Sequence, residues 1–163
     1  MKLAQIQMHV TADKAANLRH AEDLLRSVRG ADMAILPEMF CCPYDNACFR
    51  AYGEPEGGPA YQMLSRAARE LNLWLVGGSL PELDGDKIYN TAYVFDPTGT
   101  CVARHRKMHL FDIDVQGGQS FRESATLSPG NDITLFDTPY GRIGLCICFD
   151  LRFEELCRLM ALE

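Results

Sequence analysis

A chain of 163 residues with 47% hydrophobic and 23% charged residues has the composition of one globular domain, which excludes a disordered chain. The formal net charge of −6, without a cluster of Lys or Arg, argues against nucleic-acid and anionic-membrane partners. No apolar run approaches the ~20 residues of a membrane span and no signal peptide is recognised. We therefore expect a cytoplasmic protein whose seven cysteines are free thiols.

The first part of the chain predicts a parallel βαβ unit. Residues 2–10 alternate like a strand, and residues 14–28 repeat apolar side chains at three- and four-residue steps like a helix. Thr11 and Asp13 are positioned to cap that helix, and an apolar strand follows over residues 31–37. Because the links are short, we expect a right-handed crossover between parallel strands.

The middle of the chain predicts one more helix and three more strands, joined by turns. In chain order we expect a loop with a helical turn over 41–57, a helix from Pro59, a buried strand over 73–79, a turn region over 81–86, and strands over 88–95 and 100–106. Pro97 and Gly99 occupy the second and fourth positions of a type I turn, which makes the last two strands a hairpin.

The last part of the chain predicts a long ordered loop over 113–131, strands over 132–137 and 142–147, and a helix after Cys148. Cys148 therefore lies at a strand-to-helix junction, where unpaired backbone N–H groups can face a developing oxyanion. The helix dipole at such a junction favours the thiolate, so Cys148 is the candidate nucleophile. The alternative is a small buried apolar side chain, which is common for cysteine.

Two further charged residues also lie at strand ends. Glu38 directly follows the strand over 31–37 in apolar surroundings, which suit a general base; the alternative is a capping or solvated carboxylate. Lys107 lies at the end of the hairpin, where it could stabilise an oxyanion or form part of a solvated basic edge. Alternation along the strand separates Lys107 and its histidine neighbours from the flanking arginines.

In this order and with these flanking residues, the three positions resemble the nitrilase superfamily of carbon–nitrogen hydrolases. The matching segments are residues 36–40, 106–112, 121–124 with 127–130, and 147–153. The resemblance implies an α/β protein, the nitrilase-like αββα sandwich, of which this chain supplies about the first half. Residues 1–163 would be the N-terminal portion of the carbon–nitrogen hydrolase domain, with the C-terminal part absent.

The resemblance also implies a catalytic role for each matching residue. Cys148 would attack an amide carbonyl and form a thioester, and Glu38 would carry protons between the thiol, the leaving ammonia and water. Lys107 and the backbone N–H of Phe149 would hold the tetrahedral oxyanion. This chemistry implies no metal and no organic cofactor.

Four more residues have supporting roles implied by the same resemblance. Glu123 would orient Lys107 or assist proton movement, and Tyr44 would line the substrate pocket. Asp150 and Arg152 would be structural and tie the turn at Cys148 to its surroundings. The segments after Lys107 and Glu38 resemble the ω-amidase-like branch, so we expect a small ω-amide of a dicarboxylate as substrate and a homo-oligomer, a dimer or higher.

Two alternative functions remain open at this point. One is a nitrilase-fold module for binding or assembly that truncation has made catalytically incompetent. A lone half would also expose a sheet face or edge, which favours aggregation. We accordingly expect this segment alone to be inactive or poorly soluble. The other is a redox sensor that uses Cys146 and Cys148, although Cys146 is interpreted as a core residue inside the last strand.

Overall fold

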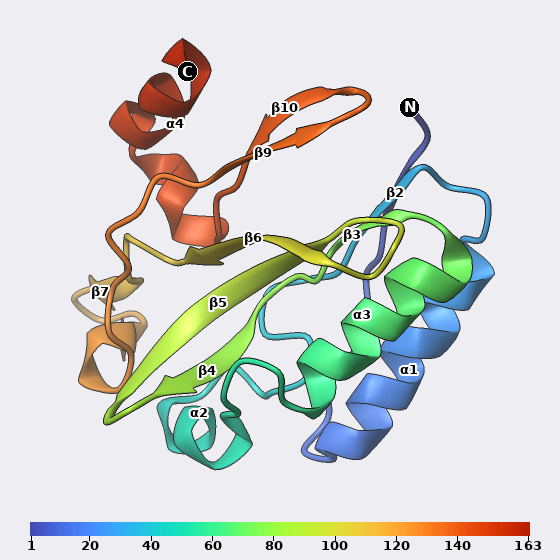
Figure 1. Ribbon diagram of the computed structural model, residues 1–163. Coiled ribbons are helices and arrows are strands. Elements are labelled where there is room, and N and C mark those ends of the chain that lie inside the picture. Colours follow the sequence, from blue (N-terminus) through green and yellow to red (C-terminus); the bar gives the residue numbers. More distant parts are fainter.

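The protein is organised around a mixed six-stranded sheet, seen in a computed structural model that describes residues 1–163 (Figure 1). Its strands are β1 (Leu3–Gln5), β2 (Met33–Ile35), β3 (Trp74–Val76), β4 (Leu80–Asp84), β5 (Lys87–Phe95) and β6 (Cys101–Arg106). The first three are parallel, and β5 runs antiparallel to β3, β4 and β6. Strand β3 pairs with the end of β5 and β4 with its first part, so β4 continues along the same edge of β5 as β3.

Helices α1 (Lys14–Ser27) and α3 (Pro59–Leu71) cover one face of this sheet (Figure 1). The side chain of Asp13 accepts a hydrogen bond from the backbone N–H of Ala16 at 2.9 Å, so the predicted cap of α1 is confirmed. The apolar stripes of both helices join the sheet in a cluster of 23 buried residues, which is the main core. The parallel βαβ unit predicted from the sequence is confirmed. No helix combines the length and the apolar run that crossing a bilayer requires.

A smaller layer covers the opposite face. The hairpin of β9 (Leu135–Thr138) and β10 (Gly141–Gly144) packs there, followed by the 3₁₀ helix η2 (Cys148–Arg152) and helix α4 (Glu154–Leu162). Seven buried residues form the contact: Met33, Val76, Ala92, Val94, Phe136, Leu145 and Ile147. The structure is therefore of the expected α/β class, with a second sheet layer that consists of one hairpin.

Several predicted segments differ from the structure. The turn expected over 81–86 is mostly strand β4. This strand can include Pro81 because it forms an edge of the sheet. On its outer side it has only a bridge between Glu82 and Glu54. The loop over 41–57 contains the seven-residue helix α2 (Asn46–Tyr52), which Asp45 caps at the N–H of Ala47. The loop over 113–131 contains a small hairpin, β7 (Asp112–Asp114) with β8 (Ser120–Arg122), and the 3₁₀ helix η1 (Glu123–Ala125).

Candidate active site

Glu38 lies just beyond the carboxyl end of β2, at the point where two backbone segments are packed tightly together. The next residue, Met39, has a φ of 50°, and its backbone N–H donates to Ser79 Oγ at 3.0 Å. Gly78 packs so closely here that a Cβ on it would lie 2.1 Å from the carbonyl oxygen of Pro37. These contacts fix the backbone on both sides of Glu38, whose side chain is 21% exposed.

Lys107 follows β6 and is completely buried. Its backbone N–H donates to the carbonyl of Asn90 at 2.9 Å, and its carbonyl accepts from the N–H of Gly130 at 2.9 Å. The ammonium Nζ lies 2.9 Å from Glu38 Oε1 and 3.0 Å from Glu123 Oε2. Burial opposes the charge on Lys107, but the two carboxylates outweigh it and raise its pKa.

Glu123 begins η1 and is also completely buried. Besides Lys107, it accepts hydrogen bonds from the Tyr44 hydroxyl and from the backbone N–H of Phe111. Burial and the hydrogen bond to Glu123 raise the pKa of Tyr44, so the phenol remains protonated. Tyr44 thus links Glu123 to the opening of the site, and its ring lines a cavity there.

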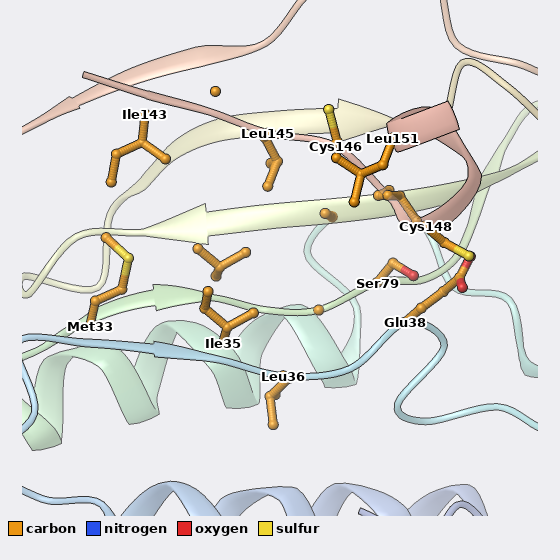
Figure 2. A pocket seen from close by; sticks show the side chains of 15 residues that line it. Met33, Ile35, Leu36, Glu38, Ser79, Ile143, Leu145, Cys146, Cys148 and Leu151 are labelled. Atoms are coloured by element: carbon orange, nitrogen blue, oxygen red, sulfur yellow. The ribbon is translucent and has the colours of Figure 1, made fainter. Parts of the chain in front are cut away.

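Cys148 begins η2 with a φ of 47°, a left-handed conformation that is uncommon for a residue with a side chain. Figure 2 shows its sulfur directed at the carboxyl group of Glu38. Partial burial and the Glu38 carboxylate raise the pKa of Cys148, so the resting group is a thiol. Burial and the neighbouring carboxylate thus act in the direction opposite to the effect expected from a helix dipole. The backbone N–H of Phe149 has no acceptor among the backbone or side-chain groups of the protein.

Asp150 connects the turn at Cys148 to the end of β6. Its buried carboxylate accepts from the backbone N–H groups of Ile147, Met108 and His109, and from ring nitrogens of His105 and His109. The structural role expected for Asp150 agrees with these contacts. Arg152 is exposed and forms no side-chain hydrogen bond or ion pair in the structure, so the structural role expected for it is not supported.

Two cavities meet at Glu38 and Cys148. One, of about 330 Å³, has 11 hydrophobic residues among its 15 lining residues and lies between the sheet and residues 143–151 (Figure 2). The other, of about 450 Å³, is lined by Tyr44, Phe111, Phe149 and Arg152 in addition to the two shared residues. The Cys148 thiol can therefore be reached from an apolar cavity and from a second cavity that contains aromatic rings and the Arg152 guanidinium.

Two features of the site differ from what the sequence indicates. Asn90 lies in the middle of β5, and its Nδ2 donates to Glu38 Oε1 at 2.8 Å. Its only signal in the sequence is a polar residue within an otherwise buried strand. Cys146 is expected inside the last strand, but β10 ends at Gly144, and in Figure 2 its sulfur points away from Glu38. Burial and nearby Cys157 raise the pKa of Cys146 to about 12.

The sequence of this chain is similar to a known protein family over almost its whole length. The family model for carbon-nitrogen hydrolase matches residues 2–163. The chain belongs to the carbon–nitrogen hydrolase family. The resemblance to the nitrilase superfamily is thereby confirmed.

Relatives in this family share about half of the residues of the chain. Omega-amidase NIT2 of Danio rerio is 48% identical over 162 residues, covering 98% of this chain and 58% of that protein. The hydrolase C26A3.11 of Schizosaccharomyces pombe is 48% identical, and the match covers 98% of this chain and 51% of that protein. The chain thus spans a little over half of the length of these curated relatives.

Solved structures of carbon–nitrogen hydrolases have the same fold over this segment. Nit3 of Saccharomyces cerevisiae, a member of branch 10 of the nitrilase superfamily, superposes with a TM-score of 0.87 at 39% identity, covering 99% of this chain and 60% of that one. A mutant of the amidase from a Nesterenkonia species superposes with a TM-score of 0.81 at 25% identity over 97% of this chain and 61% of that one. That structure shows acrylamide added at the active-site cysteine of the amidase.

Proposed function

We propose that the protein hydrolyses the C–N bond of a small amide through a thioester on Cys148. The observation that carries this proposal is the position of Glu38, whose carboxylate lies beside both the Lys107 ammonium and the Cys148 thiol. Because the resting group is a thiol, a base is needed to release the nucleophile, and Glu38 is the carboxylate within reach. The family membership and the amidase among the solved structures support the same reaction class.

The first half of the reaction forms the acyl-enzyme. Glu38 takes the proton from Cys148 as the sulfur bonds to the amide carbon, and the carbonyl oxygen becomes an oxyanion. Lys107 and the backbone N–H of Phe149 are the donors proposed for that oxyanion. Glu38 then returns the proton to the amide nitrogen, and the C–N bond breaks. Ammonia is released, and the acyl group remains as a thioester on Cys148.

The second half regenerates the thiol. Glu38 takes a proton from water, the resulting hydroxide attacks the thioester carbon, and the C–S bond breaks to release the carboxylic acid. The proton held by Glu38 returns to the sulfur, so the net reaction consumes one amide and one water. Glu123 keeps Lys107 in place and charged throughout, because both of its oxygens lie within 3.1 Å of the ammonium.

We propose an ω-amide of a dicarboxylate as the substrate. Arg152 lines the aromatic cavity beside Cys148 and has no anionic partner in the chain, so a guanidinium is available for a substrate carboxylate. Tyr44 and Phe149 line the same cavity and would contact the methylene groups between the two ends of the substrate. The names of the omega-amidase relatives agree with this substrate class.

Because the chain spans a little over half of the length of its relatives, the proposal is tested with a version extended to their length. Ammonia release from succinamate and glutaramate is measured, with propionamide as the amide that lacks a carboxylate. We expect turnover of the two ω-amides, little turnover of propionamide, and loss of activity in Cys148→Ala. Cys146→Ala is the matched control, because it removes a neighbouring thiol whose sulfur points away from Glu38, and it should keep full activity. Absence of ammonia release from all three amides, or activity that survives Cys148→Ala, would contradict the proposal; the former outcome favours a non-catalytic module.

A further inference from the structure

Asn90 forms hydrogen bonds with both of the charged residues near Cys148, Glu38 and Lys107. It is completely buried in β5, and its side-chain Nδ2 donates to Glu38 Oε1 at 2.8 Å. Its backbone carbonyl accepts from the N–H of Lys107 at 2.9 Å. One residue therefore holds the carboxylate of Glu38 through its side chain and the backbone of Lys107 through its main chain.

The other half of the Asn90 amide has no partner. Its Oδ1 is buried and accepts no hydrogen bond. Exchanging the two ends of the amide would bring Oδ1 against the Glu38 carboxylate, where two acceptors would repel, so Nδ2 is the end that faces Glu38. Buried acceptors without a donor are uncommon in folded proteins, and an apolar side chain of similar size would avoid this one. The presence of an amide here is therefore explained by the hydrogen bond to Glu38 and not by packing.

The two donors to Glu38 bind the same oxygen. Asn90 Nδ2 and Lys107 Nζ both approach Oε1, at 2.8 Å and 2.9 Å. Since neither donor engages Oε2, the carboxylate is fixed in rotation with its second oxygen free for proton transfer. Lys107 alone would leave the carboxylate free to turn about the ion pair, because a single ammonium contact does not define the plane of the group.

We infer that Asn90 is a positioning residue that orients Glu38 toward the Cys148 thiol. This inference rests on the proposed function, in which Glu38 is the base, and it adds a residue that the motif around Glu38 does not contain. Asn90 acts through Glu38 and touches no reacting atom. Its removal is therefore expected to impair proton transfer more than substrate binding.

Two substitutions test the role of the side chain and leave the backbone bond to Lys107 in place. Asn90→Leu removes the donor together with the unpaired acceptor, so folding should be retained while kcat falls on the order of 100-fold and KM changes little. Asn90→Asp keeps the shape but places a second carboxylate beside Glu38. Like charges disfavour ionisation of the base, so the acid limb of the kcat profile should move up by about one pH unit.

Thr91→Val is the matched control. Thr91 is equally buried on the same strand and also donates to a glutamate, with Thr91 Oγ1 at 2.6 Å from Glu82 Oε2, but its side chain lies on the other face of β5. Its loss should lower thermal stability and leave the acid limb unchanged. If Asn90→Leu and Thr91→Val have the same pH profile and kcat, Asn90 has only a structural role and the inference is wrong.

Alkylation of Cys148 by iodoacetamide separates this inference from the proposed function. At pH values where the free thiol is protonated, fast alkylation requires Glu38 to accept the proton. The acid limb of the alkylation rate against pH therefore reports on Glu38 without any amide substrate. A shifted acid limb in Asn90→Asp, together with slower alkylation in Asn90→Leu, supports the inference even if no amide is hydrolysed. Unchanged alkylation profiles in both variants overturn it even if amides are hydrolysed.

Discussion

Lys107 is a buried cation whose ion-pair partners are two glutamates. Its side chain is 0% exposed, and Glu38 and Glu123 lie at 2.9 Å and 3.0 Å from the ammonium. Breaking such a buried pair by removing one partner leaves the remaining charges uncompensated and is strongly destabilising. Lys107 therefore determines both the charge of the site and the stability of the structure around it.

Replacing Lys107 with Met is expected to abolish amide turnover and to lower the free energy of unfolding by about 3–5 kcal/mol, because two carboxylates then face each other without a cation between them. Urea denaturation measures the second effect. Arg142→Met is the control, since Arg142 is 49% exposed and its ion pair is with Asp137, which is 73% exposed; a change within about 1 kcal/mol is expected. Adding Glu123→Gln to Lys107→Met should recover part of the lost stability, and a further loss in that double variant would contradict this account.

Asp150 joins two elements that both carry site residues. Five nitrogen groups donate to its carboxylate, from the residues after Lys107, from His105 in β6 and from Ile147 before Cys148. Burial opposes ionisation of Asp150, but these hydrogen bonds outweigh it and lower its pKa to about 2, from an ordinary value of 3.8. The distance between Lys107 and Cys148 thus depends on a carboxylate that must be ionised.

The stability of the protein in acid should reflect this carboxylate. Because the folded-state pKa of Asp150 lies below its unfolded value, its contribution of about 2 kcal/mol is complete above the unfolded value and is lost as the pH falls toward 2. Denaturation by urea between about pH 5 and pH 2 measures this loss. Asp150→Asn should be less stable at neutral pH and should show a flatter dependence on pH in this window.

Asp137→Asn is the control for that experiment, because Asp137 is 73% exposed and pairs only with Arg142 on the surface. It should change neither the stability nor its pH dependence by a measurable amount. If Asp150→Asn retains the full acid dependence of the unsubstituted protein, other carboxylates are responsible for it.

At the scale of the elements, the break between β3 and β4 makes room for Glu38. Gly78 has a φ of 59°, and a Cβ there would lie 2.1 Å from the Pro37 carbonyl oxygen, immediately before Glu38. Gly85, in the turn between β4 and β5, has a nearly equal φ of 58°, and a Cβ added to it would have no atom within 4 Å. The two glycines therefore have the same backbone strain on substitution but differ in the contact with the Glu38 segment.

Substituting each glycine with Ala separates strain from contact. Gly85→Ala should cost about 1–2 kcal/mol of stability from the left-handed conformation and should leave amide turnover unchanged. Gly78→Ala should cost roughly a further 1–3 kcal/mol, because the backbone at Pro37 has to move, and it should also lower kcat. Thermal melts and ammonia release measure the two effects; equal losses in both variants would show that the contact with Pro37 is unimportant.

Across the whole molecule, protection of backbone amides against hydrogen exchange is expected to decrease with distance from the six-stranded sheet. The residues of β5 after Lys87 are all buried, whereas β7 and β8 form a two-stranded hairpin whose residues are mostly exposed. Hydrogen exchange followed by mass spectrometry should show β3 and β5 as the slowest segments, the β9–β10 hairpin as intermediate, and residues 112–122 as the fastest. Faster exchange in β5 than in β9 would contradict the role of the sheet as the core.

The sequence predicts the main features of this architecture because periodic segments bury one face. The helices after Asp13 and Pro59 and the hairpin around Asp96 follow from apolar spacing and turn residues. Glu38, Lys107 and Cys148 are each predicted at strand ends. In the structure Glu38 and Cys148 line the same two cavities, and the buried Lys107 pairs with Glu38. Their catalytic roles remain proposals that the experiments above test.

Other features depend on contacts that no local pattern records. The sequence predicts a turn where β4 lies because Pro81 and Glu82 oppose strand formation, but Glu82 is buried through ion pairs with Arg106 and a hydrogen bond from Thr91. The raised pKa of Cys148 is caused by burial and by the Glu38 carboxylate, which comes from a segment 110 residues away, so neither cause is recorded in the local sequence. The role of Asn90 is invisible in the sequence because it depends on which partner its amide meets in space.

The unequal surroundings of the two Glu38 oxygens have a consequence for the order of events in catalysis. With Oε1 occupied by Asn90 and Lys107, a single oxygen has to serve both the departing amine and the incoming water. Those two small molecules would then compete for one position, so the first product has to diffuse away before the acyl group can be released. Added ammonia should accordingly recapture the acyl group and regenerate amide, and isotopically labelled ammonia would appear in recovered starting material.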